Sequence, residues 1–198
     1  MADSLLDAVF RDVSRADMDA DPAVCFVLDE KLRLIYCNPA WDRFAEQNGA
    51  PHLRAELVLG MPALDSTSGE LFDYYRYRYH EVLADRRPRD HDFHCSSPEV
   101  ERLMRMHIYR LRNAPALLIS CSMRIERSHS GPSGEPIQDL YRNAQGVIVM
   151  CSNCRRTRRA AVEPETWDWV ADFVRRMPGG VSHGLCNLCL NYYYPAEN

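Results

Sequence analysis

Two pairs of cysteines in the last third of the chain place the strongest constraint on its fold. Cys151 and Cys154 form one Cys-x2-Cys pair, and Cys186 and Cys189 form the second. Two thiolates three positions apart on a tight turn can face one ion, and two such turns complete a tetrahedral shell of four sulfurs, which suits zinc at a distance of about 2.3 Å. We therefore predict one structural zinc ion, with no open position for a catalytic water.

The segment between the pairs, residues 155–185, is longer than the roughly 15 to 20 residues usual in zinc ribbons. The extra length adds only about half a kcal/mol of loop-closure entropy, against an apparent binding free energy of about 10 to 16 kcal/mol for structural zinc. Pro164 predicts the start of a helix that carries Trp167 and Val170 on one face and ends at residues 178–180. His183 lies just before the second pair and is a candidate donor to a thiolate or an alternative ligand.

Charge and hydropathy along the chain limit its partners and location. Among 198 residues, 24 basic and 28 acidic side chains give a net charge of −4, so no global field draws the protein to nucleic acid or to a membrane. No apolar run is long enough to cross a bilayer, and residues 1–17 are acidic and lack the apolar region of a signal peptide. We expect a cytoplasmic protein that does not bind membranes.

The first two thirds of the chain carry the pattern of an α+β domain. After a helical stripe in residues 3–16 come two strand-like runs, residues 23–28 and 32–37, and Asn38 then predicts the N-cap of a helix. A second helix is expected at residues 69–85. Three more strands are expected, listed here by range: 91–95, 102–111 and 116–125. In the last of these Leu117, Ile119, Cys121, Met123 and Ile125 share one face, which we predict to be buried. This order predicts a five-stranded antiparallel sheet with connecting helices.

Two stretches resemble known families. The run FVLDEKLRLIYCNPAWDRFAEQNG, residues 26–49, resembles the opening of a PAS domain, where a hairpin leads into an Asn-Pro-Ala helix start. The runs CSNCRRTRR, TWDWV, SHGLCNLC and YYYP resemble a cysteine-rich module at the carboxyl end of bacterial PAS-containing signalling proteins. The predicted organisation is an N-terminal amphipathic helix (1–20), a PAS-like sensor domain (21–125), a linker (126–140) and a four-cysteine zinc module (141–198).

These observations favour a non-catalytic bacterial signalling protein. In it the PAS domain senses a signal or dimerises, and the zinc module contacts protein partners. The resemblance implies that a homodimer would form through the N-terminal helix and the sheet, and Leu5, Leu6, Val9, Phe10 and Val13 are the candidate residues. No serine-histidine-aspartate spacing, phosphate loop or HExxH motif supports an enzyme.

Three alternatives remain. A transcriptional regulator could bind nucleic acid through Arg155, Arg156, Arg158 and Arg159. A thiol redox switch could release zinc when its cysteines are oxidised. A haem could occupy the PAS domain, with His80 as the ligand, but His80 falls about 100° from the apolar face of its predicted helix.

Overall fold

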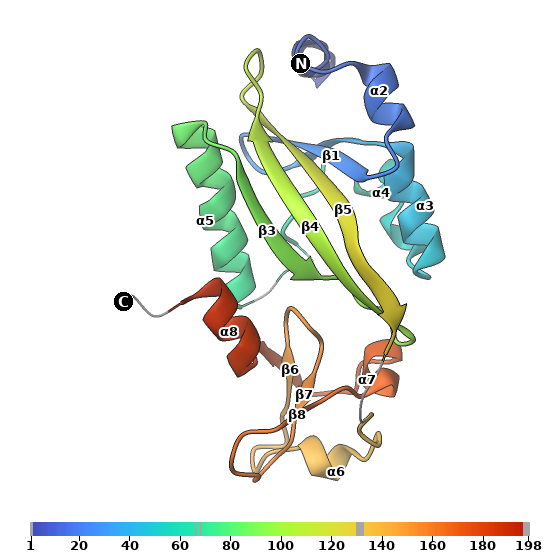
Figure 1. Ribbon diagram of the computed structural model, residues 1–198, viewed down its shortest axis with the longest axis vertical. Coiled ribbons are helices and arrows are strands. Elements are labelled where there is room, and N and C mark those ends of the chain that lie inside the picture. The colour runs from blue at the N-terminus through green and yellow to red at the C-terminus, as the bar shows by residue number, and fades with distance from the viewer. Residues whose placement is uncertain (1, 66, 68, 130–132, 196–198) are drawn as a thin grey trace. The chain divides into compact units, whose positions relative to one another are not determined.

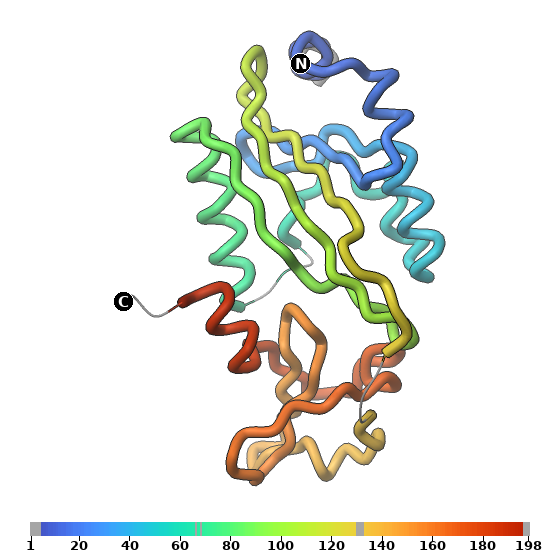
Figure 2. The backbone as a smooth tube through the Cα atoms, in the orientation of Figure 1, coloured from blue at the N-terminus to red at the C-terminus, as the bar shows by residue number. Residues whose placement is uncertain are grey.

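The computed structural model describes residues 2–65, 67, 69–129 and 133–195, and these fall into two compact units. The first unit comprises residues 1–66, 75–92 and 104–123; the second comprises residues 67–74, 93–103 and 124–198. Figures 1 and 2 trace the path of the chain through both. Each unit is described by itself below.

The larger sheet has five strands in the order β2-β1-β5-β4-β3 (Figure 1). Its strands are β1 (Val24–Asp29), β2 (Leu34–Cys37), β3 (Arg89–His94), β4 (Val100–Arg110) and β5 (Ala116–Ser128). Strands β1 and β2 form an antiparallel hairpin, and β1 also pairs antiparallel with β5, with Val24 opposite Cys121. The predicted α+β fold with a five-stranded antiparallel sheet is confirmed.

The strand pattern predicted which face of this sheet is buried, but it did not predict how far along β5 the burial extends. Met104, Met106 and Ile108 on β4 are buried, as their alternation predicts. On β5 the buried side chains stop at Cys121, and Met123 and Ile125 are 43% and 45% exposed. The prediction that Met123 and Ile125 lie in the core is therefore wrong, because alternation assigns a face to a side chain without showing whether another layer covers it.

Asn38 explains why the chain turns from strand into helix at the predicted position. Its side chain is 1% exposed, and its Oδ1 accepts hydrogen bonds from the backbone N–H of Cys25 at 3.0 Å and of Trp41 at 3.2 Å. Its Nδ2 donates to the carbonyls of Met18 and Ala23. Asn38 is thus the N-cap of α3 (Pro39–Gln47), as predicted, and it also fixes the approach to β1. The short helices η1 (Pro51–Leu53) and α4 (Ala55–Val58) follow.

At the amino end the predicted single helix is replaced by two short ones, α1 (Ala2–Val9) and α2 (Arg15–Ala20). The side chain of Ser14 accepts a hydrogen bond from the backbone N–H of Asp17, so it caps the second helix and marks the break. The apolar stripe packs on the chain's own core. Val9 is fully buried, and the partly buried residues packed there include Leu5, Leu6, Phe10 and Val13.

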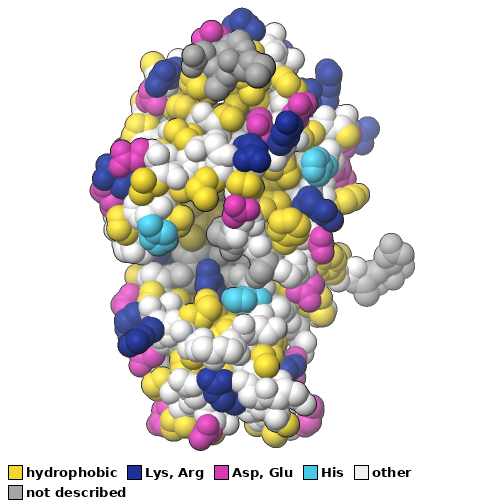
Figure 3. Space-filling model, turned by 180° about the vertical axis from the view of Figure 1, so that it is seen from behind, with side chains coloured by type: hydrophobic (Ala, Val, Ile, Leu, Met, Phe, Trp, Pro, Cys, Tyr) yellow, Lys and Arg dark blue, Asp and Glu magenta, His cyan; other side chains and the backbone are white. Residues whose placement is uncertain are grey.

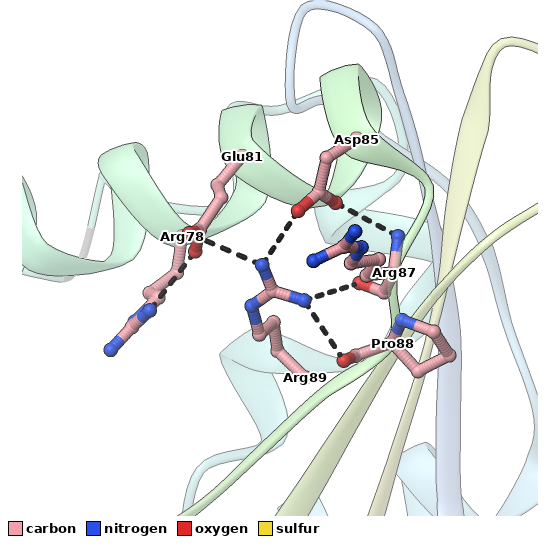
Figure 4. Close-up of polar contacts among 6 residues, drawn as sticks. All are labelled: Arg78, Glu81, Asp85, Arg87, Pro88 and Arg89. Carbon is pink, nitrogen blue, oxygen red and sulfur yellow. Dashed lines mark hydrogen bonds and ion pairs between the residues drawn. The ribbon is translucent and has the colours of Figure 1, made fainter.

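Helix α5 (Glu70–Asp85) confirms the second predicted helix, and a network of charged groups joins its end to β3 (Figure 4). The guanidinium of Arg89 lies 3.3 Å from Glu81 and 2.6 Å from Asp85, while Arg78 lies 2.9 Å from Glu81. The backbone N–H of Arg87 also donates to Asp85. These contacts hold the last turn of α5 beside the first residue of β3.

The second unit is built on a four-stranded sheet in the order β8-β7-β6-β9. Its elements are α6 (Gln138–Tyr141), β6 (Ile148–Cys151), β7 (Thr157–Arg158), β8 (Trp167–Asp168), α7 (Ala171–Arg175), β9 (Val181–Gly184) and α8 (Asn187–Tyr193). Strands β6 and β9 are parallel, whereas β7 pairs antiparallel with β6 and with β8. Among the described residues of this unit, five form a small buried hydrophobic cluster: Tyr141, Ile148, Met150, Val170 and Phe173.

The helix predicted from Pro164 is mostly absent. Residues 167–168 form strand β8, and helix begins only at Ala171. Asp168 explains the extended backbone, because it is buried between the hydroxyl of Tyr141 at 2.9 Å and the guanidinium of Arg159 at 2.6 Å. The spacing of Trp167 and Val170 is helical, but these partners of Asp168, distant in the sequence, favour the strand.

The predicted linker begins as a strand. Strand β5 continues to Ser128, Ser133 forms a β-bridge with Trp169, and the backbone N–H of Gly134 donates to the carbonyl of Trp169 at 2.8 Å. Residues 130–132 of this linker lie outside the described residues.

Candidate metal centre

The parallel pairing of β6 and β9 brings the two cysteine pairs together. Cys151, the last residue of β6, lies opposite Gly184, the last residue of β9. Because parallel strands end at the same edge of a sheet, the turn after β6 and the start of α8 after β9 meet there. Ser152 joins them, since its backbone N–H and its hydroxyl both donate to the carbonyl of Gly184, at 2.8 and 3.1 Å.

All four predicted ligand residues, Cys151, Cys154, Cys186 and Cys189, lie in one cluster. They are at most 6% exposed, and their Sγ atoms all lie within 4.8 Å of one another. The Sγ atoms of Cys154 and Cys186 are 3.7 Å apart. A tetrahedron with metal–sulfur distances of about 2.3 Å has sulfur–sulfur distances of about 3.8 Å. The cluster therefore fits a four-coordinate metal ion.

Local backbone geometry aims each pair at the centre. Around the first pair, the backbone N–H of Arg155 donates to the carbonyl of Cys151 at 3.0 Å, and Arg155 has a φ of 63°, which closes the turn. In the second pair, Cys186 occupies the N-cap position of α8, and its carbonyl accepts from the backbone N–H of Leu190 at 2.8 Å. Cys189 then lies one turn into the helix, on the same side as Cys186.

The sulfurs interact strongly with one another. Hydrogen bonds from the thiols of Cys154, Cys186 and Cys189 lower the pKa of Cys151 well below that of an ordinary thiol. The hydrogen bond that Cys154 gives to the Cys151 thiolate in turn raises the pKa of Cys154. A negative charge thus forms easily on one sulfur, and a bound cation could replace the protons on its neighbours.

Asn153 is a member of this site that sequence reasoning missed. Its side chain is 7% exposed, and its Nδ2 donates a hydrogen bond to Sγ of Cys189 at 3.2 Å. Its Oδ1 accepts from the hydroxyl of Tyr193 and from the backbone N–H of His94, both at 3.1 Å. Asn153 lies between two cysteines, and this position is the one signal in the sequence that could have indicated its role. Its hydrogen-bond partners are distant in the sequence.

His183 does not join the cluster of ligand atoms. It lies on β9 opposite Met150, and the group of metal-ligating atoms within 4.8 Å contains sulfur only. Burial, with a smaller effect from the charge of Arg155, lowers the pKa of His183. A role of His183 in supporting or replacing a ligand stays a prediction.

The other candidate residues are dispersed. His80, considered as a haem ligand, is exposed on α5. Two of the four clustered arginines are in ion pairs, because Arg158 lies 3.1 Å from Glu165 and Arg159 lies 2.6 Å from Asp168. On the face of the molecule shown in Figure 3, basic and acidic side chains are interspersed. Within the described residues, no helix has the length and apolar character that crossing a bilayer requires.

Comparison with known proteins assigns the larger part of the chain to a family. The model of the PAS fold family matches residues 18–127. No curated protein matches the chain. The PAS domain of BvgS from Bordetella pertussis is 21% identical, with a TM-score of 0.45, and the match covers 57% of this chain and 85% of that one.

Two further solved structures are similar to part of the chain. The PAS domain of nitrogen regulation protein NR(II) from Vibrio parahaemolyticus is 13% identical, with a TM-score of 0.39, over 57% of this chain and 98% of that one. A phage VqmA–DPO complex is 18% identical, with a TM-score of 0.44, over 62% and 56%. Because the family model covers more than half of its length, this chain belongs to the PAS fold family.

Proposed function

We propose that this chain is a non-catalytic signalling protein in which the PAS domain senses a signal or dimerises, and a structural zinc ion holds the C-terminal module that contacts protein partners. PAS domains are sensor and dimerisation modules of signalling proteins, and residues 18–127 match this family. The zinc ion, the contact role of the module and the absence of catalysis are the parts that this proposal adds.

The observation that carries the proposal is the group of four buried sulfurs drawn from two turns. Four thiolates form a soft donor set, which suits zinc, and a complete tetrahedral shell of protein ligands leaves no position for a reacting water. Cys154 and Cys186 belong to different pairs and already lie 3.7 Å apart. A metal there would join the end of β6 to the start of α8.

The small size of the second core supports a structural role for the metal. The hydrophobic cluster of this unit has five buried residues in the described part of the chain, and strands β7 and β8 have two residues each. A core of this size supplies little of the free energy that ordering the chain costs, so small modules commonly need a disulfide or a metal. The four cysteines are free thiols, which leaves them available as ligands.

The dimer that we propose for the PAS domain would use α1 and the sheet. Leu5, Leu6 and Phe10 are only partly buried on the chain's own core, so each retains surface that a second copy could cover. Sedimentation of the wild-type chain over a range of concentrations tests this step. A monomer at all concentrations would restrict the PAS domain to sensing.

Metal analysis of the purified full chain tests the zinc proposal. We expect about one zinc per chain, and loss of that zinc in Cys154→Ser and Cys186→Ser. Cys37→Ser is the matched control, because Cys37 is a half-buried thiol outside the cluster, and it should keep its zinc. Hydrogen exchange should show loss of protection in residues 141–198 on chelation, with protection retained on β1 and β5.

Two results would contradict this proposal. The first is wild-type protein without stoichiometric zinc when it is prepared with zinc present. The second is a serine variant of the cluster that keeps both its metal and the protection of the second unit.

A further inference from the structure

We propose that the second unit contains a binding pocket for a small aromatic monocarboxylate, next to the four-cysteine cluster. The pocket has a volume of about 440 Å³, and all of its lining residues belong to the second unit. Small-molecule sites commonly have volumes of about 300 to 1,000 Å³. Cys154 and Cys186 form part of its wall, so the pocket adds a ligand site to a module for which the proposed function names only a metal and protein contacts.

Aromatic rings make up much of the wall. Trp167, Trp169 and His129 all line the pocket. The rings of His129 and Trp169 stack with their centroids 3.8 Å apart and an angle of 23° between their planes. A hydrogen-bond contact of 3.0 Å between Nε2 of His129 and the carbonyl of Ser97 helps to fix the histidine ring. These rings offer a flat, rigid surface on which an aromatic ligand can stack.

The wall includes the indole N–H of Trp169, which is an unsatisfied donor. Trp169 is 9% exposed, and within the described residues its indole Nε1 is buried without a hydrogen-bond partner. A buried N–H without an acceptor is costly and calls for an explanation. An acceptor oxygen that reached the edge of this ring, in line with the N–H, would remove that cost.

The charges of the lining select an anion. Three carboxylates line the pocket, and each is in an ion pair with an arginine outside the lining: Glu101 with Arg127, Glu165 with Arg158, and Asp168 with Arg159. Arg156 is the only arginine or lysine among the described lining residues, and no ion pair with it is found among the described residues. It is half-buried, so a carboxylate in the pocket could bind its guanidinium with little competition from water.

The same charges favour a ligand with a single negative charge. A single guanidinium matches one carboxylate, whereas a phosphate ester with two negative charges would face three carboxylates across the same cavity. The nearby guanidinium of Arg156 therefore favours an aryl monocarboxylate over a nucleotide. The aromatic walls disfavour a short aliphatic acid, because it has no ring with which to stack on Trp167.

Calorimetric titration of the zinc-containing full chain with benzoate tests the proposal. Benzamide has the same shape without the charge, and acetate has the charge without the ring. We expect saturable binding of benzoate, with benzamide binding at least about tenfold more weakly because it lacks the charge-assisted hydrogen bond to Arg156. Acetate should not compete with benzoate.

Two variants assign the site. Arg156→Gln should weaken benzoate binding by about tenfold, whereas Arg155→Gln, which removes an exposed neighbouring arginine outside the lining, should change it by less than about twofold. Trp167→Leu should weaken benzoate and benzamide together. Zinc content is measured for each sample, so loss of metal is distinguished from loss of the pocket.

The proposal is overturned if benzoate gives no saturable signal up to about 10 mM, which corresponds to less than about 3 kcal/mol of binding free energy. It is also overturned if benzamide binds as well as benzoate, or if Arg156→Gln binds benzoate as the wild type does.

Discussion

The side-chain amide of Asn153 donates a hydrogen bond to Sγ of Cys189 at 3.2 Å, from a residue that lies between the other two cysteines of the cluster. This bond joins the two pairs directly. The hydroxyl of Tyr193 and the backbone N–H of His94 hold the carbonyl oxygen of the same amide, so its NH₂ group is oriented toward the sulfur.

Replacing Asn153 should therefore weaken metal binding without removing a ligand. We expect Asn153→Ala to lower zinc affinity by about 10- to 100-fold, as is typical for residues that orient metal ligands. Competition with a chromophoric chelator measures this change. Asn187→Ala is the control, because Asn187 is an exposed asparagine between the two cysteines of the second pair and should leave the affinity unchanged. Equal affinities for the two variants would show that Asn153 does not support Cys189.

The buried carboxylate of Asp168 should be important for the stability of the second unit. Asp168→Ala leaves the hydroxyl of Tyr141, a residue 2% exposed, without its acceptor, and such a loss costs about 1 to 3 kcal/mol. Denaturant unfolding, followed by hydrogen exchange on β6, measures the effect. Asp172→Ala removes an exposed carboxylate four positions later and should change stability by less than about 1 kcal/mol. Similar losses in both variants would contradict the role assigned to Asp168.

Local sequence signals predicted the larger sheet well. Alternation in β4, the N-cap at Asn38 and the apolar face of α5 each depend on residues within a few positions of one another, and the structure contains all three features. The four cysteines were found because metal-ligand spacing is also a local signal. Their meeting point required β6 and β9 to be neighbours, and nothing in the sequence indicates that pairing.

The predictions that failed depended on distant partners. Residues 164–170 carry a helical spacing, yet the contacts of Asp168 with Tyr141 and Arg159 hold this segment extended. Asn153 could not be identified because its hydrogen-bond partners lie 36, 40 and 59 positions away. Its local sequence resembles that of an ordinary turn residue, and only the tertiary fold gives it a function.

The network at the end of α5 predicts how stability changes in acid. Partial burial opposes ionisation of Glu81, but hydrogen bonds from Arg78 and Arg89 outweigh it and lower its pKa, while the backbone N–H of Arg87 and the side chain of Arg89 lower the pKa of Asp85. A carboxylate with a lowered folded-state pKa adds stability above its unfolded-state pKa, and this stability is lost as the pH falls through the folded-state value. The loss should therefore begin near pH 4.5 and continue below pH 3.8, the ordinary values for the two groups.

Thermal unfolding between pH 7 and pH 3 tests this dependence, with the pH range chosen to span ordinary carboxyl titration. Arg89→Gln should make the decline in melting temperature below pH 4.5 shallower, because it removes the cation that both carboxylates contact. Arg87→Gln keeps the backbone N–H that Asp85 accepts and should behave as the wild type. An unchanged decline in Arg89→Gln would show that other carboxylates cause the loss of stability at low pH.

The ion pairs of the arginine cluster predict that the second unit binds nucleic acid weakly. Arg158 and Arg159 are paired with Glu165 and Asp168, so a phosphate would have to displace a carboxylate at 3.1 Å or 2.6 Å to reach them. For Arg155 and Arg156 no ion pair is found within the described part of the chain. Two such arginines release few counterions, so we expect no gel shift of duplex DNA or single-stranded RNA at about 50 mM salt. Glu165→Gln releases Arg158 and should strengthen any residual binding. Tight wild-type binding that weakens steeply with salt would instead support a nucleic-acid regulator and contradict the contact role proposed for the module.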